Sequence, residues 1–167
     1  LARLGSRICA EERCAHEQTA VGDAISRLIA AGCELVLVFS ASAVVDRGDV
    51  VPAGIAAAGG EIVHLGMPVY PGNLLLIARL NGVTVLAAPG SARSSRLHGF
   101  DWVLQRVLAG LDVGSEEIPA MGVGGLLKEI TTRPQPRAGA QRPAAQPQRI
   151  AAVVLAAGQS RRMGVEN

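Results

Sequence analysis

The alternation of apolar and polar residues predicts a helix followed by a buried strand near the start of the chain. Apolar side chains recur at helical spacing between residues 17 and 31, at Val21, Ala24, Ile25, Leu28 and Ile29. This spacing is typical of one buried helix face, and Gly32 is placed to end the helix. Residues 35–39 are continuously apolar, which indicates a strand buried on both faces, as in a parallel sheet.

A second helix and a second strand follow in the same order. Asp49 precedes the next apolar stretch and is placed to cap a helix, because its carboxylate can accept hydrogen bonds from the exposed amides of a first turn. Pro52 suits an early helical position, and Gly59 with Gly60 is placed to end the helix. Residues 61–67 then predict another strand.

A hairpin and a last helix complete the predicted core. Two apolar runs are separated by Asn81 and Gly82, residues that supply the positive φ angles of a tight hairpin, so one antiparallel pair joins the sheet. Residues 99–111 carry apolar side chains in helical order. These elements together predict an α/β fold, a three-layer sandwich with an open, mostly parallel sheet.

Composition divides the chain into three parts. Residues 1–114 carry the predicted fold, and we expect this domain to be incomplete at its N-terminus because the chain opens on Leu1 rather than Met. Residues 115–149 indicate a short helix and then an interdomain linker, in which residues 131–149 hold four prolines. Residues 150–167 predict the first strand and loop of a truncated, Rossmann-like second domain, so the chain is interpreted as a fragment.

Charge and hydropathy narrow the class of partner. The net charge of +2 comes from the tail, because residues 131–167 hold six Arg and one Glu whereas residues 1–130 hold 10 basic and 13 acidic groups. A proline-rich basic tail with few aromatic residues favours a solvated linker over a nucleic-acid surface. The sequence contains neither an apolar run long enough for a transmembrane helix nor a signal peptide, so we expect a cytoplasmic protein without a membrane partner.

Three cysteines, an odd number without paired spacing, argue against a disulfide scaffold. Cys9, Cys14 and His16 form a C-x4-C-x-H cluster, but a fourth ligand is not evident and the spacing is not that of a zinc knuckle. We therefore interpret the cysteines as ordinary buried or edge thiols and expect no metal site.

Three loops follow predicted strands and hold the candidate binding residues. Ligands bind at the carboxyl ends of the strands in open α/β sheets, which directs attention to the segments after Phe39, Met67 and Ala88. Small and polar residues there allow close backbone approach, and free amides beside arginine suit an anion. The candidates are Ser40, Ser42, Asp49, Pro71, Gly72, Asn73, Pro89, Gly90, Ser91 and Arg93. A triad of Ser91, His98 and Asp101 is not predicted, because the glycine-flanked elbow around a nucleophile is absent.

The same loops carry a family resemblance. Through "RGDVVPAGIAAAGG", "MPVYPGN" and "LAAPGSARS", residues 20–111 resemble the molybdopterin-binding domain of molybdenum cofactor biosynthesis proteins. The resemblance implies a pterin site lined by Asp49, by the segment from Pro71 to Asn73 and by the segment from Pro89 to Ser91. The family's paired glycines are replaced here by Ala41 and Ser42. This departure leaves open whether the domain catalyses adenylylation or molybdate insertion, or only binds.

The end of the chain carries a second resemblance. "VVLAAGQSRRMG" is similar to the N-terminal signature of nucleotidyltransferases of the molybdenum cofactor type, in which a strand delivers a glycine-rich loop to the base and phosphates of an NTP. Arg162 would face the triphosphate, and Ser160 would hold the loop in shape. The implied nucleotide-binding residues are Leu155, Ala156, Ala157, Gly158, Ser160, Arg162 and Gly164.

The order of the two pieces implies a function for a longer parent protein. The first domain would bind molybdopterin or molybdenum cofactor, and the second would transfer CMP or GMP from CTP or GTP to it with Mg²⁺. The fragment alone is expected to be inactive in that step. One alternative is a non-catalytic binding or chaperone module for a molybdoenzyme partner. Another is a sugar-phosphate nucleotidyltransferase with an unrelated upstream domain. Relatives of the first domain commonly self-associate, so a homo-oligomer also stays open.

Overall fold

The computed structural model describes residues 4–122, 127–128 and 149–155, and all structural statements below concern these residues. They form an α/β fold around a six-stranded mixed sheet with the strand order β1-β8-β2-β6-β5-β3. The strands are β1 (Arg7–Cys14), β2 (Leu35–Phe39), β3 (Glu61–Leu65), β5 (Leu76–Leu80), β6 (Val83–Ala88) and β8 (Arg149–Leu155). The helices are α1 (Gln18–Ala30), α2 (Val50–Ala57) and α3 (Gly99–Leu108).

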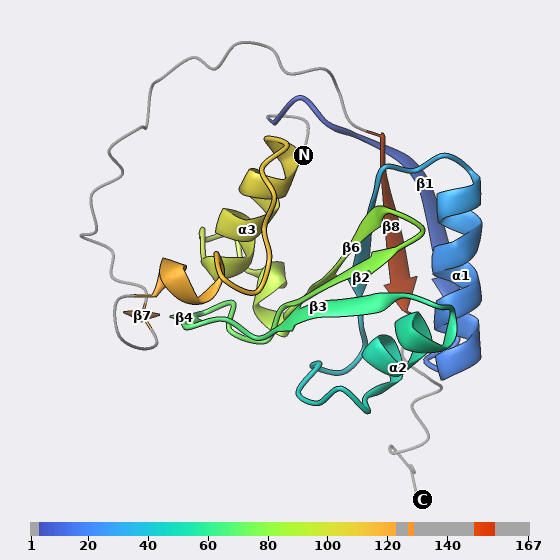
Figure 1. The fold of residues 1–167 in the computed structure, drawn as a ribbon, viewed down its shortest axis with the longest axis horizontal. Helices are drawn as coiled ribbons and strands as arrows, with labels where there is room; N and C mark the ends of the chain where they lie inside the picture. The colour runs from blue at the N-terminus through green and yellow to red at the C-terminus, as the bar shows by residue number, and fades with distance from the viewer. Residues whose placement is uncertain (1–3, 123–126, 129–148, 156–167) are drawn as a thin grey trace, which may run out of the picture.

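Helices cover both faces of the sheet. Helices α1 and α2 lie against one face and α3 lies against the other (Figure 1). The predicted α/β class and the three helices predicted between residues 17 and 111 are therefore confirmed, with α1 burying the expected stripe that includes Ala24 and Leu28. Burial of each larger side chain of this stripe, Val21, Ile25 and Leu28, contributes about 1.5–3 kcal/mol, so α1 is held mainly by its packing on the sheet.

Strand direction places the carboxyl ends of five strands at one edge of the sheet. Strands β1, β8, β2 and β6 pair in parallel, and β5 runs against β6. Strand β3 pairs antiparallel with β5 and so runs in the same direction as β6. The register aligns Leu65 with Leu76, Leu76 with Ala87, and Ala87 with Val38. We call the end of the sheet where β1, β8, β2, β6 and β3 finish the carboxyl edge.

The hairpin between β5 and β6 forms as predicted. Asn81 and Gly82 have φ angles of 51° and 77°, and the strands pair Leu80 with Val83 directly beside them. Two consecutive positive φ angles match the right-handed twist of the flanking strands, which is why Asn and Gly are favoured at this turn. The preceding strand β3 ends at Leu65 rather than at residue 67, because Gly66 leaves the extended conformation with a φ of 89°.

The ends of the chain differ from the sequence-based expectations. Strand β1 was not predicted, and β8, predicted to begin a separate domain, lies between β1 and β2 in the same sheet. The connection from β1 through α1 to β2 skips one strand position, and the apolar run of β8 fills it, with Ala151 fully buried. The short helix predicted after residue 115 is wrong for the described part, which holds one turn of 3-10 helix, η3 (Pro119–Met121).

Two further short elements lie apart from the main sheet. Strands β4 (Val69–Tyr70) and β7 (Leu127–Lys128) pair in parallel as a small two-stranded sheet. None of the helices in the described segments is long and apolar enough to cross a membrane.

Candidate functional site

Four loops meet the carboxyl edge. Three are those selected from the sequence, residues 40–49 after β2, residues 66–75 after β3, and residues 89–98 after β6. The fourth, residues 15–17, connects β1 to α1. The register across the sheet brings the starts of the first three loops to the same level. The structure therefore gathers at one edge the segments that hold the ten pterin-site candidates.

His16, in the loop after β1, contacts the two candidate serines after β2. Its Nε2 lies 3.3 Å from Ser40 Oγ and 3.5 Å from Ser42 Oγ. The Ser42 amide donates to Ser40 Oγ at 3.3 Å, so the loop curls back on the end of β2. Sequence reasoning grouped His16 with the cysteines and missed this contact. The contact could not be predicted because β1 was not predicted. His16 lies two residues after the end of β1, which places it at the carboxyl edge.

Asp49 stabilises its own loop. Its Oδ2 accepts hydrogen bonds from the amides of Val45 at 2.7 Å and Asp46 at 2.9 Å. These two bonds lower the pKa of the Asp49 carboxyl, and the nearby His16 lowers it further. Asp49 is the N-terminal cap residue of α2 by position, but its side chain makes no hydrogen bond to the amides of α2. The predicted capping bond is therefore wrong, because the carboxylate turns back toward residues 45 and 46.

The second loop packs on the start of α3. Hydrogen bonds from the Gly66 amide to the Leu75 carbonyl at 2.7 Å, and from the Met67 amide to the carbonyl of the candidate Asn73 at 2.9 Å, close the loop. Gly72 has a φ of 113°, and a Cβ there would lie 2.7 Å from the amide nitrogen of Phe100.

The carbonyl of Pro71 accepts a hydrogen bond from the Gly99 amide at 3.0 Å. Pro71 and Gly72 together form the contact between the second loop and α3. This contact positions the next residue, Asn73.

The third loop contains two unsatisfied polar atoms. Pro89 is buried and precedes a short 3-10 helix, η2 (Gly90–Arg93), whose Gly90 and Arg93 are exposed. The buried imidazole of His98 places Nε2 2.8 Å from the Ser91 carbonyl oxygen. Because a carbonyl only accepts, Nε2 carries the hydrogen. Ser91 Oγ and His98 Nδ1 are both buried without a hydrogen-bond partner among the described residues.

The geometry at Ser91 has no catalytic triad. His98 is bonded to the Ser91 carbonyl and not to its hydroxyl. Asp101 Oδ2 accepts from the His98 backbone amide at 2.9 Å and lies 3.7 Å from His98 Nδ1. His98 therefore ties the third loop to the start of α3.

The candidate residues form two bonded groups. One joins His16, Ser40 and Ser42. The other joins Pro71 to Gly99 at the start of α3, and Ser91 to His98. Their side chains offer hydroxyl and imidazole groups, which can donate to an anion or accept from a ring N–H. Ser91 Oγ is the strongest indication of a ligand, because a buried hydroxyl without a partner loses free energy until something bonds to it.

A cavity lies elsewhere in the molecule. Its volume is about 250 Å³, and it opens at the opposite edge of the sheet, where β2 and β6 begin. It is lined by Glu34, Leu35, Arg79, Thr84, Val107, Gly110, Leu111 and Asp112. It contains none of the predicted site residues. Two of these lining residues, Arg79 and Asp112, form an exposed ion pair, with Nη2 2.8 Å from Oδ1. We place the candidate site at the carboxyl edge, because the unsatisfied Ser91 hydroxyl and the converging loops are there.

The cysteine cluster predicted from the sequence does not form a metal site in the described part of the chain. Cys9 contacts Cys33 and His16 contacts Ser40, so the cluster of Cys9, Cys14 and His16 is dispersed. Within the segments that the structure describes, no three His, Cys, Asp or Glu side chains are placed to hold a metal ion. Of the nucleotide-binding candidates, Leu155 ends β8, and the others lie outside the described residues. Comparison of the chain with protein-family models, curated proteins and solved structures found no match.

Proposed function

We propose that the carboxyl edge of this domain binds molybdopterin. The observation that carries the proposal is the convergence of three loops at the same level of the sheet, each holding the residues that the family resemblance assigns to a pterin site. This is the position at which open α/β sheets bind ligands. The resemblance of "MPVYPGN" and "LAAPGSARS" identifies the ligand class, and the geometry supplies a suitable place for it.

The donor groups fit the two chemical parts of such a ligand. A pterin carries ring N–H, carbonyl and amino groups, which require hydrogen-bond partners when buried, and Ser91 Oγ is a buried hydroxyl that has no partner among the described residues. Its phosphate requires several donors, and the hydroxyls of Ser40 and Ser42 both lie within 3.5 Å of His16 Nε2, as a cluster of hydroxyl and imidazole groups. We therefore assign the phosphate to the His16 cluster and the ring to the Ser91 side.

The arrangement favours binding over chemistry in this domain. Asp49 is the carboxylate that the family resemblance assigns to the pterin site. It accepts two backbone hydrogen bonds, which keep it ionised and hold it in its own loop. A carboxylate held in this way is poorly placed to ligate a metal or move a proton. We therefore propose that this domain binds molybdopterin without catalysing a reaction on it, as a non-catalytic binding or chaperone module would.

A second part of the proposal concerns a longer parent protein. Strand β8 ends at Leu155 on the carboxyl edge, and the residues that resemble a nucleotidyltransferase signature follow it in sequence. In the parent we propose that this segment binds CTP or GTP with Mg²⁺, with Arg162 toward the triphosphate. The nucleoside monophosphate would then be transferred to the pterin phosphate and pyrophosphate released. The activity would need residues downstream of Asn167.

Calorimetric titration of the 167-residue chain with molybdopterin, without oxygen, tests the binding proposal. We expect saturable binding that Ser91→Ala and Ser40→Ala each weaken by about tenfold, the loss of one hydrogen bond to a charged or buried group. Ser95→Ala, an exposed serine in the same third loop, is the matched control and should leave affinity unchanged.

Unchanged affinity in both the Ser91 and Ser40 variants would remove the assignment of the site. Binding of a sugar 1-phosphate in place of molybdopterin would instead favour a sugar-phosphate nucleotidyltransferase.

A further inference from the structure

The sulfur atoms of Cys9 and Cys33 meet across 24 residues of sequence. Cys9 lies on β1 and Cys33 lies in the connection between α1 and β2, yet the two Sγ atoms are 2.8 Å apart. Cys33 is only 2% exposed, whereas Cys9 is partly buried. The Cys33 thiol is therefore shielded from solvent, whereas the Cys9 thiol is partly accessible to it.

A bulge in β1 brings Cys9 into this contact. Ile8 pairs with Ile150 and Ala10 pairs with Ala151, so Cys9 is the extra residue at a shift of register. In a regular strand, Cys9 and Ala10 would face opposite sides of the sheet. Here both pack on the same hydrophobic cluster beneath α1. Bulges of this kind re-aim a side chain, and this one turns the Cys9 thiol toward the helical layer.

The partner thiol is held by the end of α1. Gly32 has a φ of 81°, and the Cys33 amide donates to the Leu28 carbonyl at 3.2 Å. The turn at Gly32 and this hydrogen bond end α1 and hold Cys33 beneath the helix, just before β2 begins. One sulfur thus belongs to a rigid corner of the fold, and the other belongs to an edge strand.

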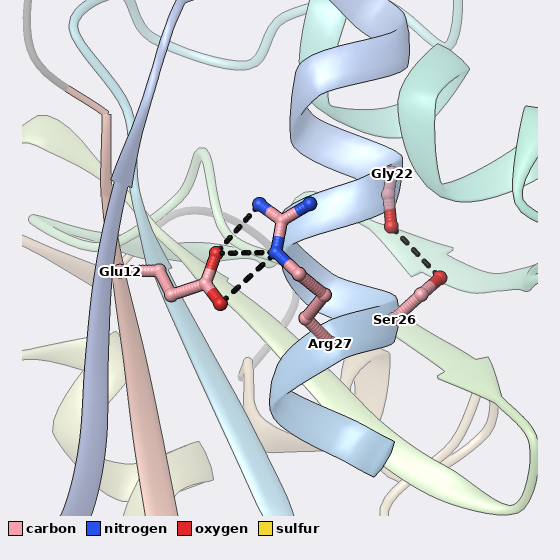
Figure 2. Close-up of polar contacts among 4 residues, drawn as sticks. All are labelled: Glu12, Gly22, Ser26 and Arg27. Carbon is pink, nitrogen blue, oxygen red and sulfur yellow. Dashed lines mark hydrogen bonds and ion pairs between the residues drawn. The ribbon is translucent and has the colours of Figure 1, made fainter. Parts of the chain in front are cut away.

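The strand that carries Cys9 packs on the cluster beneath α1 through partly buried side chains, and its ion pair with α1 is exposed to water. In the described sheet, β1 pairs with β8 alone. Arg27 on α1 and Glu12 on β1 form an ion pair, with Nη2 2.7 Å from Oε2 (Figure 2). The Arg27 side chain is 58% exposed, so solvent and salt screen this pair. A covalent bond between β1 and the α1 corner would fasten the edge strand far more firmly.

We propose that Cys9 and Cys33 form a reversible disulfide by exchange with a low-molecular-weight disulfide such as oxidised glutathione. The accessible Cys9 thiolate attacks one glutathione sulfur, forms a mixed disulfide and releases one glutathione thiolate. The Cys33 thiolate then attacks Cys9 Sγ and releases the second glutathione. Two protein thiols lose two electrons and two protons, and one oxidised glutathione becomes two reduced molecules.

Cys14 provides an internal control. It lies on the same strand and is also partly buried, but burial raises the pKa of its thiol, and the neighbouring Glu12 raises it further. A raised pKa reduces the thiolate fraction, so we expect Cys14 to react slowly with oxidised glutathione. A Cys14→Ser variant retains Cys9 and Cys33 and should behave as the parent chain does.

Tryptic peptide mapping after incubation with oxidised glutathione tests the pairing directly. Cleavage after Arg7, Arg13, Arg27 and Arg47 places the three cysteines on three different peptides. We expect one linked product, joining "ICAEER" to "LIAAGCELVLVFSASAVVDR", in both the parent chain and Cys14→Ser. Cys9→Ser should abolish it, and dithiothreitol should reverse it.

The thermal midpoint supplies a second readout that does not depend on the proposed pterin site. Closing a loop of this length should raise Tm by roughly 5–10 °C, reversibly with reductant, and only in chains that keep both cysteines. Stable glutathione adducts on Cys9 without the linked peptide, or a link that involves Cys14, would overturn the proposal. Retention of both thiols under an excess of oxidised glutathione in the folded chain would also overturn it.

Discussion

Gly22 of α1 and Gly54 of α2 cross in direct contact, so closely that a Cβ on Gly22 would lie 2.7 Å from the Gly54 carbonyl oxygen. The approach is reciprocal, because a Cβ on Gly54 would lie 2.6 Å from the carbonyl oxygen of Gln18. The crossing draws α2 onto α1 and positions the start of α2, where the loop that holds Ser40 and Asp49 ends. The geometry of the candidate site therefore depends on two residues that have no side chain.

Gly22→Ala should destabilise the chain although alanine is the better helix former. The added methyl group must displace backbone atoms, at a cost of about 1–3 kcal/mol, against a gain of up to about 1 kcal/mol in helix propensity. Urea unfolding followed by circular dichroism measures the difference. Asp23→Ala, the exposed neighbour on the same helix, is the control and should change stability by no more than about 0.5 kcal/mol. Equal stability of both variants would contradict the tight crossing.

Gly72→Ala should both destabilise the fold and weaken the proposed binding of molybdopterin. The residue has a φ of 113°, which costs a side chain about 1–2 kcal/mol, and its Cβ would press on the amide of Phe100. Gly90→Ala is the control for stability, because its φ is not positive and nothing lies within 4 Å of a Cβ there. Ser95→Ala, an exposed serine outside the candidate residues, is the control for affinity. Calorimetric unfolding should show a loss of stability in Gly72→Ala and not in Gly90→Ala, and titration should show a loss of affinity in Gly72→Ala and not in Ser95→Ala.

Local signals in the sequence were sufficient for the centre of the fold. The helical spacing around Leu28 and the apolar run from Leu35 to Phe39 each encode one element, and each formed within a residue or two of its predicted bounds. The turn at Asn81 and Gly82 was likewise predictable, because it depends on the φ preference of two adjacent residues.

The elements at the two ends of the chain depend on contacts far apart in sequence. Strand β1 contains Glu11, Glu12 and Arg13, and its bulge at Cys9 breaks the alternation that would reveal it. Its partner, β8, is some 140 residues away along the chain, as in the pairing of Arg7 with Arg149. Without β1, neither the contact of His16 with Ser40 nor that of Cys9 with Cys33 could be inferred. The three strand-end loops were identifiable because they follow strands with strong local patterns.

Asp49→Asn should destabilise the chain most at neutral pH. Two backbone amides lower the pKa of this carboxyl in the folded state, so its ionised form stabilises the fold above the pKa of the unfolded chain. That contribution is lost as the pH falls through the lower, folded pKa. The difference in Tm between the parent and the variant should therefore be largest near pH 7 and should shrink below about pH 4. A difference that is constant with pH would show that the amide bonds do not depend on the charge.

His16→Ala should weaken the binding of molybdopterin by about tenfold, because it removes one of the groups assigned to the ligand phosphate. Glu17→Ala, the exposed neighbour, is the control and should bind as the parent does. His16 Nε2 and Ser40 Oγ are 3.3 Å apart, so we expect their effects to be coupled. The double variant of His16 and Ser40 should then lose less affinity than the two single variants lose together. Strictly additive losses would mean that the two side chains act at separate places, and unchanged affinity in His16→Ala would remove this residue from the proposed site.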